Sequence, residues 1–142
     1  MVGENKIRRF RRKAPREYLG DYEELVDSLR KVANRIIDSP DRVEDRRLLY
    51  DIIYMGGLTQ YLHLEVSTCE ITNPRKMESE IREVMSRVSD VLEIAESREL
   101  DVRMFRRTHK ERTNCMIKAL REYNGLFRFF SEIDRPPIRK TV

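Results

Sequence analysis

The stretch from Arg75 to Asn124 constrains the fold most, because it contains no proline or glycine and repeats apolar residues at helical spacing. From Met77 to Ala95 the apolar residues recur at alternating steps of four and three. This is the spacing of a heptad seam, in which one side of an α-helix packs against other helices. The same register continues to Phe130, with Arg98 as one polar position.

We therefore expect one helix of about 50 residues, on the order of 75 Å long. A helix of that length exceeds the core of a 142-residue monomer, so earlier helices of the chain or a second chain must cover its apolar seam. The alternative is a break between Ser97 and Leu100, with Ser97 capping a fourth helix. With that break the chain would fold as a four-helix bundle.

A second heptad seam precedes the long helix. Between Tyr18 and Ile36 the apolar residues again alternate at steps of four and three, which predicts a first helix. Ser39 followed by Pro40 predicts a cap and the first position of a second helix, because proline has no amide hydrogen to leave unbonded there. Asn73 and Pro74 repeat this signature at the start of the long helix.

Two adjacent glycines, Gly56 and Gly57, lie in the middle of the predicted second helix. Each glycine costs a helix interior roughly 1 kcal/mol relative to alanine. We interpret the pair as a kink or as a close crossing with another helix.

These patterns predict an all-α fold: a short helical hairpin plus a long C-terminal helix, in an antiparallel coiled-coil or helical-bundle architecture that we expect to be oligomeric. We divide the chain into a disordered basic tail (1–16), a helical domain (17–133) and a short basic tail (134–142). No apolar run approaches the ~18 residues of a membrane span, and we expect no contact with a membrane.

The positive charge is concentrated in the first tail. The whole chain carries a formal charge of +4, whereas residues 1–16 alone carry seven bases and one acid, a formal +6. We predict that this tail is an import signal or a polyanion-binding arm, formed by Lys6, Arg8, Arg9, Arg11, Arg12 and Lys13. A weaker basic cluster from Arg103 to Arg112 is interpreted as an exposed helix face.

Motifs for catalysis or cofactor binding are absent from the sequence. Five glycines form no phosphate-binding loop, and the two cysteines and two histidines are not at metal-ligand spacing. We interpret His63 and His109 as residues that are hydrogen-bonded or that set the register between packed helices. We interpret Cys69 and Cys115 as small packing residues. The prediction is a non-enzyme with no catalytic residues, no metal and no cofactor.

The first seam carries a family resemblance. Its pattern Tyr18-Leu19-x-x-Tyr22-x-x-x-Val26-x-x-Leu29 resembles the opening motif of the N-terminal domain of the inhibitor-of-growth (ING) family. The apolar steps from Ile81 to Phe127 are similar to that family's long second helix. The chain departs from the family at Arg30, where the family usually has proline, and its two cysteines and two histidines are too few for the family's PHD finger.

This resemblance implies a non-catalytic nuclear scaffold subunit, with a histone-binding domain, in a histone acetyltransferase or deacetylase complex. Protein partners would bind by helix packing, either as a second copy of this chain or as subunits of such a complex, and histone or nucleic acid would bind the basic tail. The alternative is a sequence-nonspecific helical nucleic-acid-binding protein that uses the basic N-terminal arm. The residues predicted to form the coiled-coil or partner interface are Tyr18, Tyr22, Leu25, Leu29, Ile81, Val84, Val88, Val91, Phe105, Met116, Leu120 and Phe127.

Overall fold

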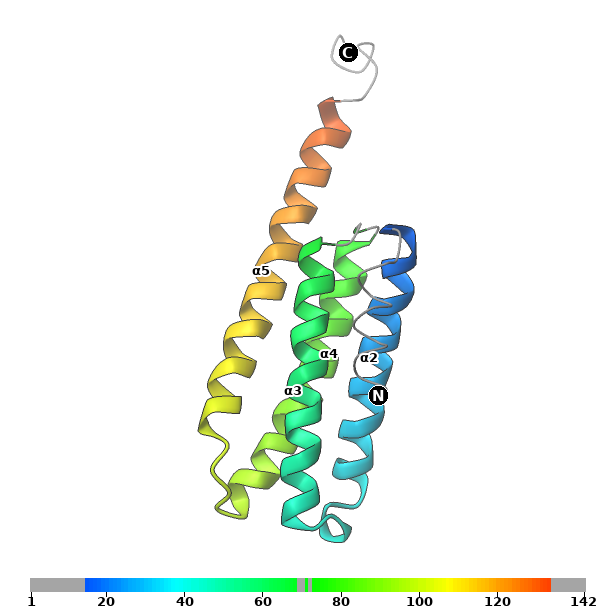
Figure 1. The fold of residues 1–142 in the computed structure, drawn as a ribbon. Helices are drawn as coiled ribbons and strands as arrows, with labels where there is room; N and C mark the ends of the chain where they lie inside the picture. Colours follow the sequence, from blue (N-terminus) through cyan, green and yellow to red (C-terminus); the bar gives the residue numbers. More distant parts are fainter. Residues whose placement is uncertain (1–14, 69–70, 72, 134–142) are drawn as a thin grey trace.

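The computed structural model describes residues 15–68, 71 and 73–133, with side chains for 21–68, 71 and 73–123. These residues form helices and no strand, which confirms the all-α class. The elements are α2 (Pro15–Asp38), a short 3-10 helix η1 (Pro40–Arg42), α3 (Asp45–Thr68), α4 (Pro74–Ser97) and α5 (Arg103–Ile133) (Figure 1).

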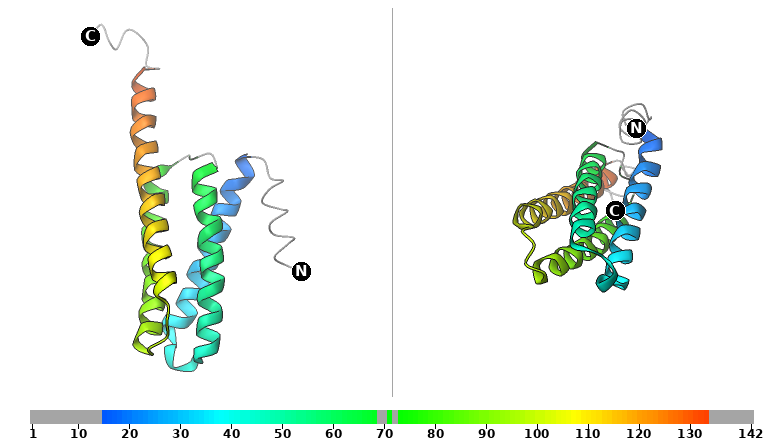
Figure 2. Two further views of the ribbon diagram at one scale, coloured as in Figure 1. Left: turned by 60° about the vertical axis from the view of Figure 1, so that its left-hand side comes forward. Right: turned by 60° about the horizontal axis from the view of Figure 1, so that its bottom comes forward.

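The four α-helices lie side by side as a bundle in which α2 and α4 run in one direction and α3 and α5 in the other (Figures 1 and 2). Helix α2 packs against α3 and α4, and α5 packs against the same two helices. Thus α2 and α5 occupy opposite corners of the bundle. The end of α5 extends beyond the other three helices (Figure 2).

Both predicted heptad seams face the interior of this bundle. Leu29, Ile36, Ile81, Val84 and Val91 are completely buried. The seam of α4 is thus covered by helices of the same chain, which is the first of the two arrangements that the sequence left open. Burial of each such side chain stabilises the fold by roughly 1.5–3 kcal/mol.

The single long helix predicted from Arg75 to Asn124 is wrong, because the chain reverses direction between Ser97 and Arg103. The alternative, a break between Ser97 and Leu100 that gives a bundle of four α-helices, is confirmed. The amide of Leu100 donates to the carbonyl of Ala95 (3.1 Å) and that of Glu99 donates to the carbonyl of Glu96 (3.0 Å). Glu99 has a φ of 60°. This is a Schellman motif, which ends a helix and usually has glycine at the position held here by Glu99.

The predicted role of Ser97 as the cap of a fourth helix is also wrong. Its hydroxyl donates back to the carbonyl of Ile94 (2.6 Å), within the last turn of α4. The side chain that meets the start of α5 belongs to Asp101, whose Oδ1 accepts from the backbone amide of Arg103 (3.4 Å).

Arg98 connects this reversal to the turn between α2 and α3. Its guanidinium donates to the carbonyls of Pro40 and Val43 and to the carboxylate of Asp45. The second helix was expected to begin at Pro40, but α3 begins at Asp45 and Ser39 makes no capping hydrogen bond through its side chain. Pro40 instead begins the short 3-10 helix η1, which is separate from α3. The carbonyls of Pro40 and Val43 accept hydrogen bonds from Arg98.

The start of α4 agrees with its sequence signature. Pro74 occupies the first turn, and the Asn73 side chain accepts a hydrogen bond from the amide of Lys76 (3.1 Å). This bond satisfies one of the amides that a helix N-terminus leaves without an internal partner.

Tyr22 is 3% exposed, and its hydroxyl lies 3.4 Å from the carbonyl of Met77 and 3.4 Å from Oε1 of Glu80. The first seam therefore packs on the start of α4. Helix α5 lies at the corner of the bundle opposite α2.

We predict that Tyr22→Ala lowers the free energy of unfolding by about 3–5 kcal/mol, because it removes a buried aromatic ring. Tyr22→Phe keeps the ring and should cost only about 1 kcal/mol. Urea denaturation of the two variants measures both values. Similar costs for the two would show that the hydroxyl, and not the ring, stabilises this contact.

A second prediction concerns the left-handed residue after α4. Glu99→Gly should raise the free energy of unfolding by about 0.5–1 kcal/mol, because glycine adopts a positive φ without the steric cost of a Cβ. Glu99→Ala retains that Cβ and serves as the control. Equal stability of the glycine and alanine variants would show that Glu99 is not strained.

Candidate binding surfaces on α3 and α5

Helix α3 is apolar on two opposite faces. Its inner face contributes Leu48, Met55 and Leu62 to the core. Between Asp51 and Glu65 the helix contains no Asp, Glu, Lys or Arg, although 38% of the whole chain is charged. A helix that is apolar all round is normally buried all round.

The outer face of α3 nevertheless lies at the surface. Tyr50, Ile53 and Leu64 are 65%, 59% and 54% exposed, and Tyr54 is 43% exposed. We call these four residues the outer stripe. Three of its members, Tyr50, Tyr54 and Leu64, lie in heptad register. Together with Gly57 and Tyr61 they follow alternating steps of four and three.

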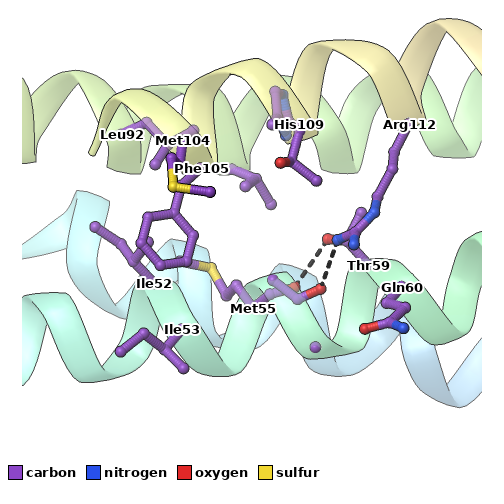
Figure 3. A pocket seen from close by; sticks show the side chains of 14 residues that line it. Ile52, Ile53, Met55, Thr59, Gln60, Leu92, Met104, Phe105, His109 and Arg112 are labelled. Carbon is purple, nitrogen blue, oxygen red and sulfur yellow. Dashed lines mark hydrogen bonds between the residues drawn. The ribbon is translucent and has the colours of Figure 1, made fainter.

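A cavity of about 430 Å³ opens beside the outer stripe, between α3 and α5. Val88 and Leu92 of α4 form part of its lining (Figure 3). Its volume falls in the range of about 300–1,000 Å³ that is typical of small-molecule sites.

The glycine pair leaves room for this cavity in the wall that α3 provides. A Cβ at Gly57 would meet no atom within 4 Å, and one at Gly56 would lie 3.8 Å from the Phe105 ring, an ordinary contact. The pair is therefore not at a close helix crossing within this bundle, contrary to one of the two expectations, and α3 continues through it from Asp45 to Thr68. The sequence identified the glycine pair as unusual, but only the structure shows that both glycines line a cavity.

The cavity is apolar toward one end and polar toward the other. Ile52, Leu92, Met104 and Phe105 lie toward one end, and Thr59, Gln60 and Arg112 lie toward the other (Figure 3). The Thr59 hydroxyl donates to the carbonyl of Met55 (2.8 Å).

Arg112 supplies a positive charge to the polar end. Its Nη1 donates to the carbonyl of Gly56 (3.1 Å), and none of the residues in the cavity lining is acidic. The described residues place no carboxylate within ion-pairing distance of this guanidinium.

His109 lines the same cavity and is uncharged at neutral pH. Burial, followed by the charge of Arg106, lowers its pKa from 6.5 to about 4, and a hydrogen bond with the Met85 backbone acts in the opposite direction. Its Nδ1 is buried without a hydrogen-bond partner among the described residues. Among the residues that line the cavity, Arg112 therefore carries the formal charge at pH 7.

The structure places most of the predicted interface residues in the interior of this chain. Phe105 is partly buried and lines the cavity. A partner would reach the others only if the bundle opened. The buried residues of the predicted set are Tyr22, Leu25, Leu29, Ile81, Val84, Val88, Val91, Met116 and Leu120.

The remaining predicted site residues lie outside the described part. They are the side chains of Tyr18 and Phe127 and the tail residues Lys6, Arg8, Arg9, Arg11, Arg12 and Lys13. The outer stripe was not among the residues predicted to bind a partner, and Arg112 was predicted only as a member of the basic cluster from Arg103 to Arg112. The absence of charge between Asp51 and Glu65 was a signal that could have identified the stripe.

The basic cluster on α5 makes several contacts within the protein. Arg106 donates to Ser89 and forms an ion pair with Glu96 (2.7 Å), and this hydrogen bond lowers the pKa of Glu96. Arg103 pairs with Asp101 (3.0 Å). Only part of this cluster is therefore the simple exposed face that was expected.

Cys115 is exposed on α5, so its interpretation as a packing residue is wrong, and Cys69 lies outside the described residues. No group of three or more potential metal-binding side chains was found among the residues that the structure describes. Within the same residues, no helix combines the length and apolar character needed to cross a membrane.

Comparisons with protein-family models, with curated proteins and with solved structures find no match for this chain. The resemblance to the ING family stays a prediction. The segment from Ile81 to Phe127, on which it partly rests, comprises parts of two antiparallel helices in this structure.

We predict that His109 reduces stability in mild acid. Because the pKa is lower in the folded protein, the unfolded chain binds a proton between pH 6.5 and about 4 that the folded protein does not bind. The free energy of unfolding should therefore fall as the pH is lowered through this interval. Urea denaturation at pH 7 and pH 4.5 should show a larger loss for the natural protein than for His109→Gln. Equal losses would contradict the prediction, since other groups that titrate in this interval are common to both proteins.

Proposed function

We propose that the protein is a non-catalytic scaffold whose outer stripe binds an amphipathic helix of a protein partner. The single observation that carries this proposal is the second apolar face of α3, which the bundle leaves exposed although it contains no charged residue between Asp51 and Glu65. Large exposed apolar side chains that lie on one face of a helix are typical of interaction sites in soluble proteins.

The spacing of the outer stripe favours a helix as the occupant. Tyr50, Tyr54 and Leu64 lie in heptad register along α3, so a partner helix with the same spacing can pack its apolar side chains between them. Exposed tyrosines favour the same function, because tyrosine combines a large apolar ring with a polar hydroxyl and is enriched at protein interfaces.

A nuclear setting and membership of a histone-modifying complex belong to this proposal as its predicted context. They rest on the composition of the basic tail and on the family resemblance. The alternative, nonspecific nucleic-acid binding through the basic tail, predicts affinity that falls steeply with salt. Apolar helix packing should persist at several hundred millimolar salt, so the salt dependence of partner binding distinguishes the two.

The test places a photo-cross-linking amino acid at Tyr54 in the full chain, in cells that express it naturally. The proposal expects cross-links to a partner segment with apolar residues in heptad spacing. Cross-links to α3 of another copy of this chain would identify a homodimer and overturn the assignment to a different partner. Cross-links to nucleic acid would favour the alternative function.

Leu64→Asp should weaken binding of the captured segment about tenfold or more, because it places a charge within an apolar contact. It should change the free energy of unfolding by about 0.5 kcal/mol or less, since Leu64 is more than half exposed. Arg107→Asp, on the exposed surface of α5, is the matched control and should leave binding unchanged. Unchanged binding by Leu64→Asp would contradict the proposal.

A further inference from the structure

We propose that the cavity between α3 and α5 is a binding site for a small amphipathic monocarboxylic acid. Its carboxylate would pair with Arg112, and its apolar chain would lie against Ile52, Leu92 and Phe105. The cavity shares Ile53 with the outer stripe, but this proposal concerns the space between the helices and a small molecule as the ligand.

The glycine pair is the first argument for a ligand. Each glycine destabilises the middle of α3 by roughly 0.5–1 kcal/mol relative to alanine. Within the described structure, no packing requirement offsets this cost at Gly57, since a Cβ there would meet no atom within 4 Å. Both glycines line the cavity, and at Gly56 the missing Cβ would lie 3.8 Å from the Phe105 ring, so the helix loses stability where it leaves space beside that ring.

The charge of the lining is the second argument. Arg112 is half-buried and has one hydrogen bond to a described residue, whereas a guanidinium has five N–H donors. With no acidic residue in the lining, the ligand is expected to supply the negative charge. A carboxylate can accept two parallel hydrogen bonds from a guanidinium, which matches the donors that remain.

The apolar end is the third argument, and it determines the rest of the ligand. Side chains of Ile52, Leu92 and Phe105 offer no hydrogen-bonding group, so an alkyl chain or an aromatic ring fits there better than a sugar or a nucleotide (Figure 3). A phosphate dianion would also exceed the single positive charge of Arg112. A monoanion with an apolar body satisfies both ends.

The experiment uses the full chain, labelled at the methionine methyl groups, and follows their NMR signals during titration with decanoate below its micelle concentration. Met55 and Met104 line the cavity and should shift in a saturable manner, whereas Met116, which is buried elsewhere on α5, should not. Decanol and decylamine are the probes with no charge and with the opposite charge. Each should bind at least tenfold more weakly than decanoate.

Two variants test the site without relying on a loss of folding. Gly56→Leu places a side chain in the cavity beside the Phe105 ring and should abolish the decanoate shifts without lowering the melting temperature. Arg112→Met keeps the aliphatic stem and should weaken decanoate binding at least tenfold but leave decanol binding unchanged. Arg107→Met, a matched change outside the lining, should have no effect on either.

Three results would overturn the proposal. The first is the absence of saturable shifts at Met55 and Met104. The second is decanoate binding that survives in Gly56→Leu, which would place the ligand elsewhere. The third is equal affinity for decanoate and decanol, which would show an apolar cavity without anion recognition. None of these outcomes bears on the outer stripe, where Tyr54 and Leu64 do not line the cavity.

Discussion

The arrangement of the bundle depends on the interactions of Arg98 at one end of the molecule. A single guanidinium bonds the carbonyls of Pro40 and Val43 and the carboxylate of Asp45, so the turn after α2 and the turn after α4 are held together. Arg98 also caps α4, directly before the left-handed residue that reverses the chain. Because α5 then runs back along α4, the apolar side of α4 is covered within one chain. Hydrogen bonds to a charged group are stronger than those between neutral groups, which suits this side chain to hold two turns.

Helix α3 carries apolar side chains on two faces: of the five large apolar side chains that are exposed among the described residues, four lie on α3. Its inner face is required for the core, where Leu48 and Leu62 are completely buried. Its outer face contributes little to the core and exposes Tyr50, Ile53 and Leu64 to solvent. The two proposed binding properties both follow from this helix: the outer stripe would bind a protein partner, and the glycine pair leaves space for a ligand beside α5.

Charged residues on α5 have different roles according to the side of the helix on which they lie. Arg106 binds α4 through Ser89 and Glu96, whereas Arg112 reaches across the cavity to the backbone of α3. The sequence presented both as members of one basic cluster. The contacts show that a part of that cluster fastens the helices to one another, and that Arg112 is the member that gives the cavity its charge.

The sequence by itself determined the all-α class, the first helix, the Asn73 cap and the residues of the core, because these follow from the spacing of apolar residues and from local capping chemistry. Only the tertiary structure decided whether the long seam breaks between Ser97 and Leu100 and what surrounds the glycine pair. The reversal at Glu99 lacks the glycine that normally marks such a turn, and Arg98, which binds its partners more than 50 residues away in the sequence, looked like an ordinary polar position in a continuous heptad. The cavity was equally hidden, since an empty space depends on which side chains from three helices meet around it, and that is not a property of any local segment.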